Sequence, residues 1–216
     1  MAMSALRFAL VTEGSSDRGI LPHLEELCSR AGAGEVEGSA PNLGVLPQPP
    51  GKRVAEQVRA ALGLVPEARI IFVHRDADSS DDTLAQRDIE SGVAEVDGCP
   101  RHVGLVPIQE LEAWLLTDEQ AIRDVAGNPG GRTPLHLPKI SGIERLASPK
   151  ERLEQVLVEA CELSGRRLKA FRKAFPYHRS ILLERLDIDG KISRLPAWQR
   201  FVSETTRAVK EILATQ

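Results

Sequence analysis

Two aspartates one residue apart, Asp76 and Asp78, follow the apolar run Ile70–Val73 in the stretch IIFVHRDADSSDD. In an extended chain, side chains two residues apart point to the same side, so both carboxylates can share one ion or bridge two. Neighbouring carboxylates repel each other, and a divalent cation removes this repulsion. Mg²⁺ and Mn²⁺ prefer oxygen ligands, often completed by water and substrate phosphates. The spacing therefore predicts a site for one or two of these ions.

The same aspartates have a second interpretation, because Asp also favours turns and helix N-caps. We assign the nearby Asp81 and Asp82 to that role, at the start of the next helical segment. The metal site is favoured because three groups of acids are expected to converge: further acids follow the first and the last apolar runs in the same way. These further acids are Glu13 with Asp17, and Glu110 with Glu112.

Alternating strand-like and helical segments must position these acids. Short apolar runs indicate strands at 7–12, 69–74 and 101–108, with room for a short strand at Gly44–Leu46. Helical periodicity is found at 20–28, 54–64 and 83–96, and another helix opens in QELEAWLL. Alternation of this kind predicts an α/β fold, with a mostly parallel sheet flanked by helices. Ligands bind such sheets beyond the carboxyl ends of the strands, so the three acidic groups are expected at one edge.

The sequence changes character after Gly127, where a Gly- and Pro-rich loop begins. Helical signals then dominate, at 149–162, 166–175, 177–187 and 196–214. We therefore expect an α/β domain over 1–127 and a helical C-terminal region over 128–216 that packs on it.

Composition limits the classes of protein to consider. The chain has 216 residues with a formal net charge of −3, which argues against a strongly basic nucleic-acid coat but leaves room for a local basic face. Aromatic residues make up only 4 %, so no stacking platform for single strands is expected. Three scattered cysteines indicate reduced thiols and a cytoplasmic location. The N-terminal sequence predicts neither a signal peptide nor a membrane span.

One dense basic run stands out in the C-terminal region. It is expected to form an amphipathic helix, and its charges serve either as a solvated face or as contacts to a phosphate backbone. The run comprises Arg166, Arg167, Lys169, Arg172, Lys173 and, further on, Arg179. Trp114, by contrast, shares an apolar face with Leu111 and Leu115 and is expected in the core.

The segments VTEGSSD (11–17) and IIFVHRDAD (70–78) together resemble the Toprim domain. That domain occurs in topoisomerases, bacterial primases, some ribonucleases and the overcoming-lysogenization-defect (OLD) nucleases. Its pattern is Glu-Gly after the first strand and Asp-x-Asp after a later one. Glu13 matches the family glutamate, Asp76 and Asp78 match its metal-binding pair, and Asp17 matches an extra acid of the OLD-like branch. The resemblance implies a Toprim/Rossmann-like α/β fold.

Three later segments resemble a small uncharacterised bacterial Toprim-like family, whose members are often encoded beside an ATPase of the ABC/SMC type. These segments are VPIQELEAWLLTD (106–118), LPKISG (137–142) and SPKERLEQVL (148–157). The chain departs from the usual pattern at His74 and Arg75, where an all-apolar strand is expected. A cation there can pair with the acids, contact phosphate or face solvent.

The resemblance implies a Mg²⁺- or Mn²⁺-dependent nuclease, working with an ATPase partner in phage defence or genome maintenance. Glu13, Asp76 and Asp78 would be catalytic, and metal ligands would come from these three and from Asp17, Glu110 and Glu112. Lys139 either lies near the scissile phosphate or is an ordinary surface lysine.

Two other classes stay open. One is a small-molecule phosphohydrolase or phosphotransferase, which should carry a nucleophilic Asp or a phosphate loop; the sequence has no GxxxxGK[ST]. The other is a non-catalytic Toprim-like module that binds metal or nucleic acid and mediates interactions.

Overall fold

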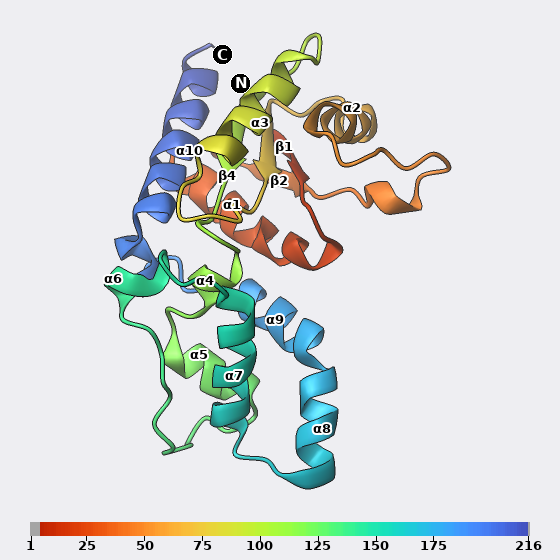
Figure 1. The fold of residues 1–216 in the computed structure, drawn as a ribbon. Helices are drawn as coiled ribbons and strands as arrows, with labels where there is room; N and C mark the ends of the chain where they lie inside the picture. Colours follow the sequence, from red (N-terminus) through yellow and green to blue (C-terminus); the bar gives the residue numbers. More distant parts are fainter. Residues whose placement is uncertain (1–4, 216) are drawn as a thin grey trace. The chain divides into compact units, whose positions relative to one another are not determined.

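The computed structural model describes residues 5–215 and divides them into two compact units (Figure 1). The first, called here the sheet unit, comprises the described residues through Arg75, Asp82–Val106 and the residues from Gln199 on. The second, called here the helical unit, comprises Asp76–Asp81 and Pro107–Trp198. The sequence suggested a different division, at residue 127.

The sheet unit is built on four parallel strands in the order β2-β1-β3-β4. Their bounds are β1 Leu6–Val11, β2 Val36–Ser39, β3 Ile70–His74 and β4 Arg101–Leu105. All five residues of β3 are buried, as expected for a parallel strand that is covered on both faces and therefore apolar throughout. The expected α/β fold with a parallel sheet flanked by helices is confirmed.

Helices cover both faces of this sheet. On one face, Phe72 makes edge-to-face contacts with Phe8 and with Phe201 of α10 (Pro196–Ala214), which runs alongside the strands in Figure 1. On the other face, Gly104 lies against α3 (Thr83–Ala94), where a Cβ would come within 2.7 Å of the Gln86 amide. Glycine at this position thus lets α3 pack closely on β4.

The remaining helical elements of the sheet unit are the 3₁₀ helix η1 Ser15–Ile20, α1 Leu21–Arg30, the 3₁₀ helix η2 Leu43–Val45 and α2 Val54–Leu64. Among them, α1 and α2 agree closely with the sequence prediction. Pro22 lies in the first turn of α1, as its missing N–H requires. Gly92 lets α3 approach α2 closely, because a Cβ there would come within 2.5 Å of Val54.

The strand expected at Gly44–Leu46 is wrong, because that segment forms η2. The Asn42 side chain accepts a hydrogen bond from the Gly44 N–H and so caps a turn rather than extending a strand. The sheet instead contains β2, a strand that the sequence analysis did not predict. Its sequence, VEGS, does not alternate between apolar and polar residues. Gly38 in β2 leaves room for the ring of Phe8, which any Cβ there would overlap.

The helical unit holds the following elements: α4 Glu112–Leu115, α5 Glu119–Val125, α6 Ile140–Ile143, α7 Pro149–Cys161, α8 Gly165–Lys173, α9 Phe175–Glu184 and the 3₁₀ helix η3 Lys191–Arg194. Its core contains Trp114 and Trp198, whose rings meet edge to face with centroids 5.0 Å apart. The expectation that Trp114 is a core residue is confirmed. Helix α8 differs from the others because it buries none of its residues.

None of the described helices is both long enough and apolar enough to span a bilayer. The three cysteines are free thiols, and Cys28 and Cys161 are buried.

Candidate functional site

The turn after β1 carries Glu13 and is held in place by Asp17. The Gly14 N–H donates to Asp17 Oδ2 at 2.9 Å, and the Thr12 hydroxyl donates to the Gly14 carbonyl at 2.8 Å. Asp17 is only 5 % exposed. A Cβ on Gly14 would lie 3.3 Å from Asp17 Oδ2, so a glycine fits this close approach best. Asp17 therefore fixes the conformation of the segment that presents Glu13.

The two residues that depart from an apolar strand, His74 and Arg75, both face acids of this turn. His74 Nδ1 lies 3.4 Å from Asp17 Oδ2, and both side chains are buried. Arg75 Nη1 lies 3.8 Å from Glu13 Oε1. The sequence left three possibilities for a cation at the end of β3: pairing with the acids, contact with phosphate or exposure to solvent. In the structure, the cation pairs with the acids.

Arg75 is anchored by more than Glu13. Its Nη2 donates to Gln57 Oε1 at 2.7 Å and to the Lys52 carbonyl at 3.0 Å, and its Nε lies 3.6 Å from Asp88. The residue is 8 % exposed, whereas 41 % of the Glu13 side chain is exposed. A nearly buried guanidinium thus supports a carboxylate that is open to solvent.

In the helical unit, the Asp76–Asp78 segment is fixed by backbone hydrogen bonds. The Asp78 N–H donates to the Gln109 carbonyl at 2.9 Å, and the Gln109 N–H donates to the Ser79 carbonyl at 3.1 Å. Both Asp78 (φ 50°) and Gln109 (φ 61°) adopt left-handed backbone conformations. Such conformations in residues other than glycine are uncommon and are often found at functional sites.

This conformation corrects one step of the spacing argument. The shared direction of two side chains in a D-x-D pattern requires an extended chain, and Asp78 is not extended. The structure also uses Asp76 locally, because its Oδ1 accepts the Leu111 N–H at 2.9 Å, just before α4 begins.

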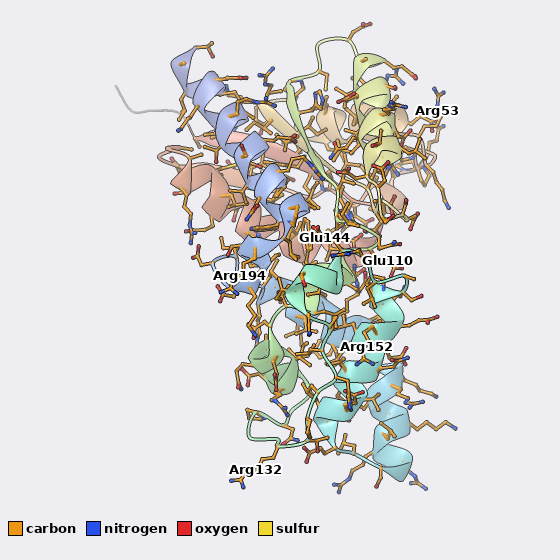
Figure 2. All side chains as sticks on the ribbon, turned by 60° about the vertical axis from the view of Figure 1, so that its left-hand side comes forward. Arg53, Glu110, Arg132, Glu144, Arg152 and Arg194 are labelled. Atoms are coloured by element: carbon orange, nitrogen blue, oxygen red, sulfur yellow. The ribbon has the colours of Figure 1, made fainter. Side chains whose placement is uncertain are left out.

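The Glu110 side chain, labelled in Figure 2, meets the start of α7, where its Oε2 accepts the Lys150 N–H at 3.0 Å. Burial raises the pKa of Glu110, and the nearby charges of Glu112 and Asp76 raise it further, while the Lys150 hydrogen bond opposes them. Glu112 and Asp76 therefore lie close enough to Glu110 to affect its ionisation. Glu112 is buried and pairs with the guanidinium of Arg179, with Nε 2.6 Å from Oε1.

The basic run divides into two parts. Its α8 members are all exposed on a helix that contributes nothing to the core. They are Arg166, Arg167, Lys169, Arg172 and Lys173. Arg179 lies on α9 and is buried in its pair with Glu112, so it takes no part in this exposed face. Lys139, which precedes α6, is exposed as well.

A cavity of about 310 Å³ lies beside Glu13, within the sheet unit. It is lined by the turn after β1, by the loop after β2 and by Gln57 of α2. Arg18, Asn42 and Gln57 line it, and sequence reasoning singled out none of them. For Arg18 a signal existed: it follows Asp17 directly in the EGSSDR segment.

The oxygen donors available suit a hard cation, although no cluster is complete by itself. Within residues 5–215, no group of three or more His, Cys, Asp or Glu side chains is arranged to hold a metal ion. Mg²⁺ commonly uses only one or two carboxylates, with water and substrate phosphates as its other ligands. Glu13 in the sheet unit, and Asp76 and Asp78 in the helical unit, each offer a carboxylate of this kind, whereas Glu112 is engaged by Arg179.

Comparison of the chain with protein-family models, with curated proteins and with solved structures found no match.

Proposed function

We propose that the protein is a metal-dependent nuclease of Toprim type, which hydrolyses phosphodiester bonds of DNA or RNA with Mg²⁺ or Mn²⁺. One observation carries the proposal. Strands β1 and β3 are parallel neighbours in the sheet, and an acid stands two residues beyond the end of each: Glu13 after Val11, and Asp76 after His74. The carboxyl ends of such strands are where open α/β sheets bind ligands.

The resemblance to the Toprim domain supplies the roles of these residues. Glu13 would act as a metal ligand or as general acid and base, and Asp76 and Asp78 would hold the ion. When bound, the ion would activate water and stabilise charge on the leaving oxygen. Asp17 and Glu110 remain proposed ligands. We give Glu112 less weight, because its carboxylate already neutralises Arg179.

Arg75 has a supporting role in this proposal. It holds the Glu13 carboxylate through charge, while its own hydrogen bonds to Gln57 and to the Lys52 carbonyl fix the guanidinium. A fixed cation beside a solvent-exposed carboxylate orients that carboxylate, which suits a group that must accept a proton or bind a cation.

Helix α8 is the proposed contact to the nucleic-acid backbone. Its five cations are all exposed, on a helix without a buried residue, so they are available to contact phosphates. Neutralising phosphates releases counterions and supplies most of the nonspecific affinity for nucleic acid. With a net charge of −3, the chain should bind weakly alone, which favours an ATPase partner that gathers several weak contacts. A cytoplasmic setting fits the free thiols.

Metal dependence tests the proposal first. Isothermal calorimetry should detect Mn²⁺ binding to the wild type, and Asp76→Ala should weaken that binding. Glu67→Ala is the matched control, because Glu67 is an exposed acid of the sheet unit that pairs with Arg7. Equal Mn²⁺ affinity in wild type and Asp76→Ala would remove Asp76 from the site.

The cavity beside Glu13 favours one alternative, a phosphohydrolase or phosphotransferase acting on a small molecule. Its volume of about 310 Å³ falls at the low end of small-molecule sites. A panel of single- and double-stranded DNA and RNA, together with nucleotides and p-nitrophenyl phosphate, separates the two. Turnover of the small esters alone would favour the alternative, and binding without any turnover would favour a non-catalytic module.

A further inference from the structure

The cavity beside Glu13 has the composition of a ligand site. It opens at the carboxyl ends of β1 and β2, the edge at which parallel sheets bind ligands. One wall is the turn after β1, and another is the loop that leads from β2 to α2, drawn in orange in Figure 1. All of its lining residues belong to the sheet unit.

Arg18 lines this cavity, and one donor of its guanidinium is unused. Its Nε is buried and has no hydrogen-bond partner among the described residues. Buried guanidinium N–H groups are rarely left unpaired, because losing water without gaining an acceptor is unfavourable. Arg18 thus brings a positively charged side chain to the cavity lining.

The charges of the cavity select the kind of acceptor. Among the described lining residues, Glu13 and Arg18 are the charged ones, and Glu13 already faces Arg75. Arg18 therefore suits a ligand group with a single negative charge. A triphosphate would bring several negative charges close to the Glu13 carboxylate, and the repulsion would oppose its binding.

The other walls suit the rest of a nucleotide. Asn42 and Ser15 offer polar groups, while Pro41, Leu43 and Pro50 offer apolar surface on the loop. A volume of about 310 Å³ accommodates a ligand of nucleotide size rather than a duplex.

We propose that this cavity seats one nucleotide of the nucleic-acid substrate, with the Arg18 guanidinium bound to a phosphodiester. The inference rests on the proposed nuclease function and deepens it. Guanidinium groups bind phosphate oxygens through strong, directional hydrogen bonds, so Arg18 would set which phosphate lies beside Glu13. Arg18 is thus a substrate-binding residue in this account.

Thymidylyl-thymidine, which has one phosphodiester and no other charge, is the probe. It is titrated into the full-length protein with EDTA present, so that no metal contributes. Calorimetry should detect binding to the wild type, and Arg18→Gln should weaken it by about tenfold or more, since a charge-assisted hydrogen bond is removed. Arg18→Lys should restore part of the affinity. Arg53→Gln is the matched control, because Arg53 (labelled in Figure 2) lies outside the cavity lining and pairs with Glu95.

A second variant guards against a misfolded Arg18→Gln protein. Gly44 also lines the cavity, and a Cβ there would meet the Asn42 side chain at an ordinary 3.5 Å. Gly44→Trp should fold, as judged by its melting temperature, and should block binding by occupying the space.

The outcomes separate the two proposals. Equal affinity of thymidylyl-thymidine for wild type, Arg18→Gln and Gly44→Trp, no binding to the wild type, or tighter binding of dTTP would overturn the cavity assignment. Cleavage of nucleic acid with an unchanged KM in Arg18→Gln would overturn it too, while leaving the nuclease proposal intact. If the wild type binds thymidylyl-thymidine through Arg18 but never cleaves nucleic acid, the nuclease proposal is refuted and the cavity assignment is retained.

Discussion

Arg75 and Glu13 meet just beyond the ends of two neighbouring strands, with Nη1 of the arginine 3.8 Å from Oε1 of the glutamate. The arginine is nearly buried and the glutamate is open to solvent. The arginine also donates hydrogen bonds to the Lys52 carbonyl and to Gln57 of α2. The guanidinium therefore links the Glu13 turn to the body of the sheet unit.

Arg75→Ala should lower the free energy of unfolding by about 1–3 kcal/mol, because it leaves the Gln57 and Lys52 acceptors without their donor. Urea denaturation followed by circular dichroism measures this. Arg53→Ala, which removes an exposed pair with Glu95, should change stability by less than about 1 kcal/mol. Equal losses in the two variants would contradict the anchoring role of Arg75.

The buried pair of Glu112 and Arg179 gives a second prediction. Arg179→Met should destabilise the protein by about 3–5 kcal/mol, because it leaves the Glu112 carboxylate buried without its cation. Adding Glu112→Leu should recover much of that stability, since both charges are then gone. Thermal unfolding of the two single variants and the double variant measures the coupling. Additive losses would show that the two side chains do not interact.

Glu110 should make stability depend on pH. Burial raises its pKa above the ordinary value of 4.5, so the folded protein binds a proton more tightly than the unfolded chain. The glutamate therefore costs nothing below pH 4.5, and its ionisation destabilises the fold as pH rises through the raised pKa. Glu110→Gln keeps an acceptor for the Lys150 N–H and removes the ionisation.

The stability gained by Glu110→Gln over wild type should thus be larger at about pH 7 than at about pH 4. The increase should stay under about 1 kcal/mol, because the carboxylate is largely solvated. Denaturation series at the two pH values give the difference. A stability gain of Glu110→Gln over wild type that is larger at about pH 4 than at about pH 7 would refute the raised pKa of Glu110.

Charge reversal on α8 tests the proposed backbone contact. The triple variant Arg166→Glu, Arg167→Glu and Lys169→Glu should weaken nucleic-acid binding and flatten its salt dependence, by roughly one unit of slope for each phosphate that is no longer neutralised. Stability should hardly change, because α8 buries none of its residues. A matched reversal uses three exposed cations outside α8, namely Arg185, Lys191 and Lys210. Identical salt slopes in wild type and the α8 variant would assign the run to a partner surface or a solvated face.

Local patterns in the sequence predicted most of the fold. The apolar run of β3 and the helical spacing of α2 are set by neighbouring residues, and both elements appear where the sequence indicated. Strand β2 was missed because VEGS gains its place from pairing with β1 and from the space that Gly38 leaves for Phe8. Such a strand forms only by pairing with a segment that is distant in the sequence, and local propensity does not capture that pairing.

The sequence indicated the acids of the candidate site, and it also indicated a cation at Arg75, whose partner stayed open. Acid residues after apolar runs give a visible pattern, and this pattern identified Glu13 and Asp76. Which of its possible partners Arg75 takes, and the unsatisfied nitrogen of Arg18, depend on three-dimensional packing, so spacing along the chain could not decide them. The left-handed backbone of Asp78 was likewise hidden, because hydrogen bonds to the distant Gln109 and its neighbours impose it.

Cleavage of nucleic acid by Glu13→Gln is the most direct test of the nuclease proposal. The substitution keeps the size of the side chain and removes a charge that is 41 % exposed, so the fold should persist. With Mn²⁺ or Mg²⁺, wild type and the control Glu67→Gln should cut labelled DNA or RNA, alone or with the proposed ATPase partner. Glu13→Gln at an unchanged melting temperature should lose activity by about a hundredfold or more, as expected when a general acid or base is removed. Cleavage by Glu13→Gln at the wild-type rate would contradict the account.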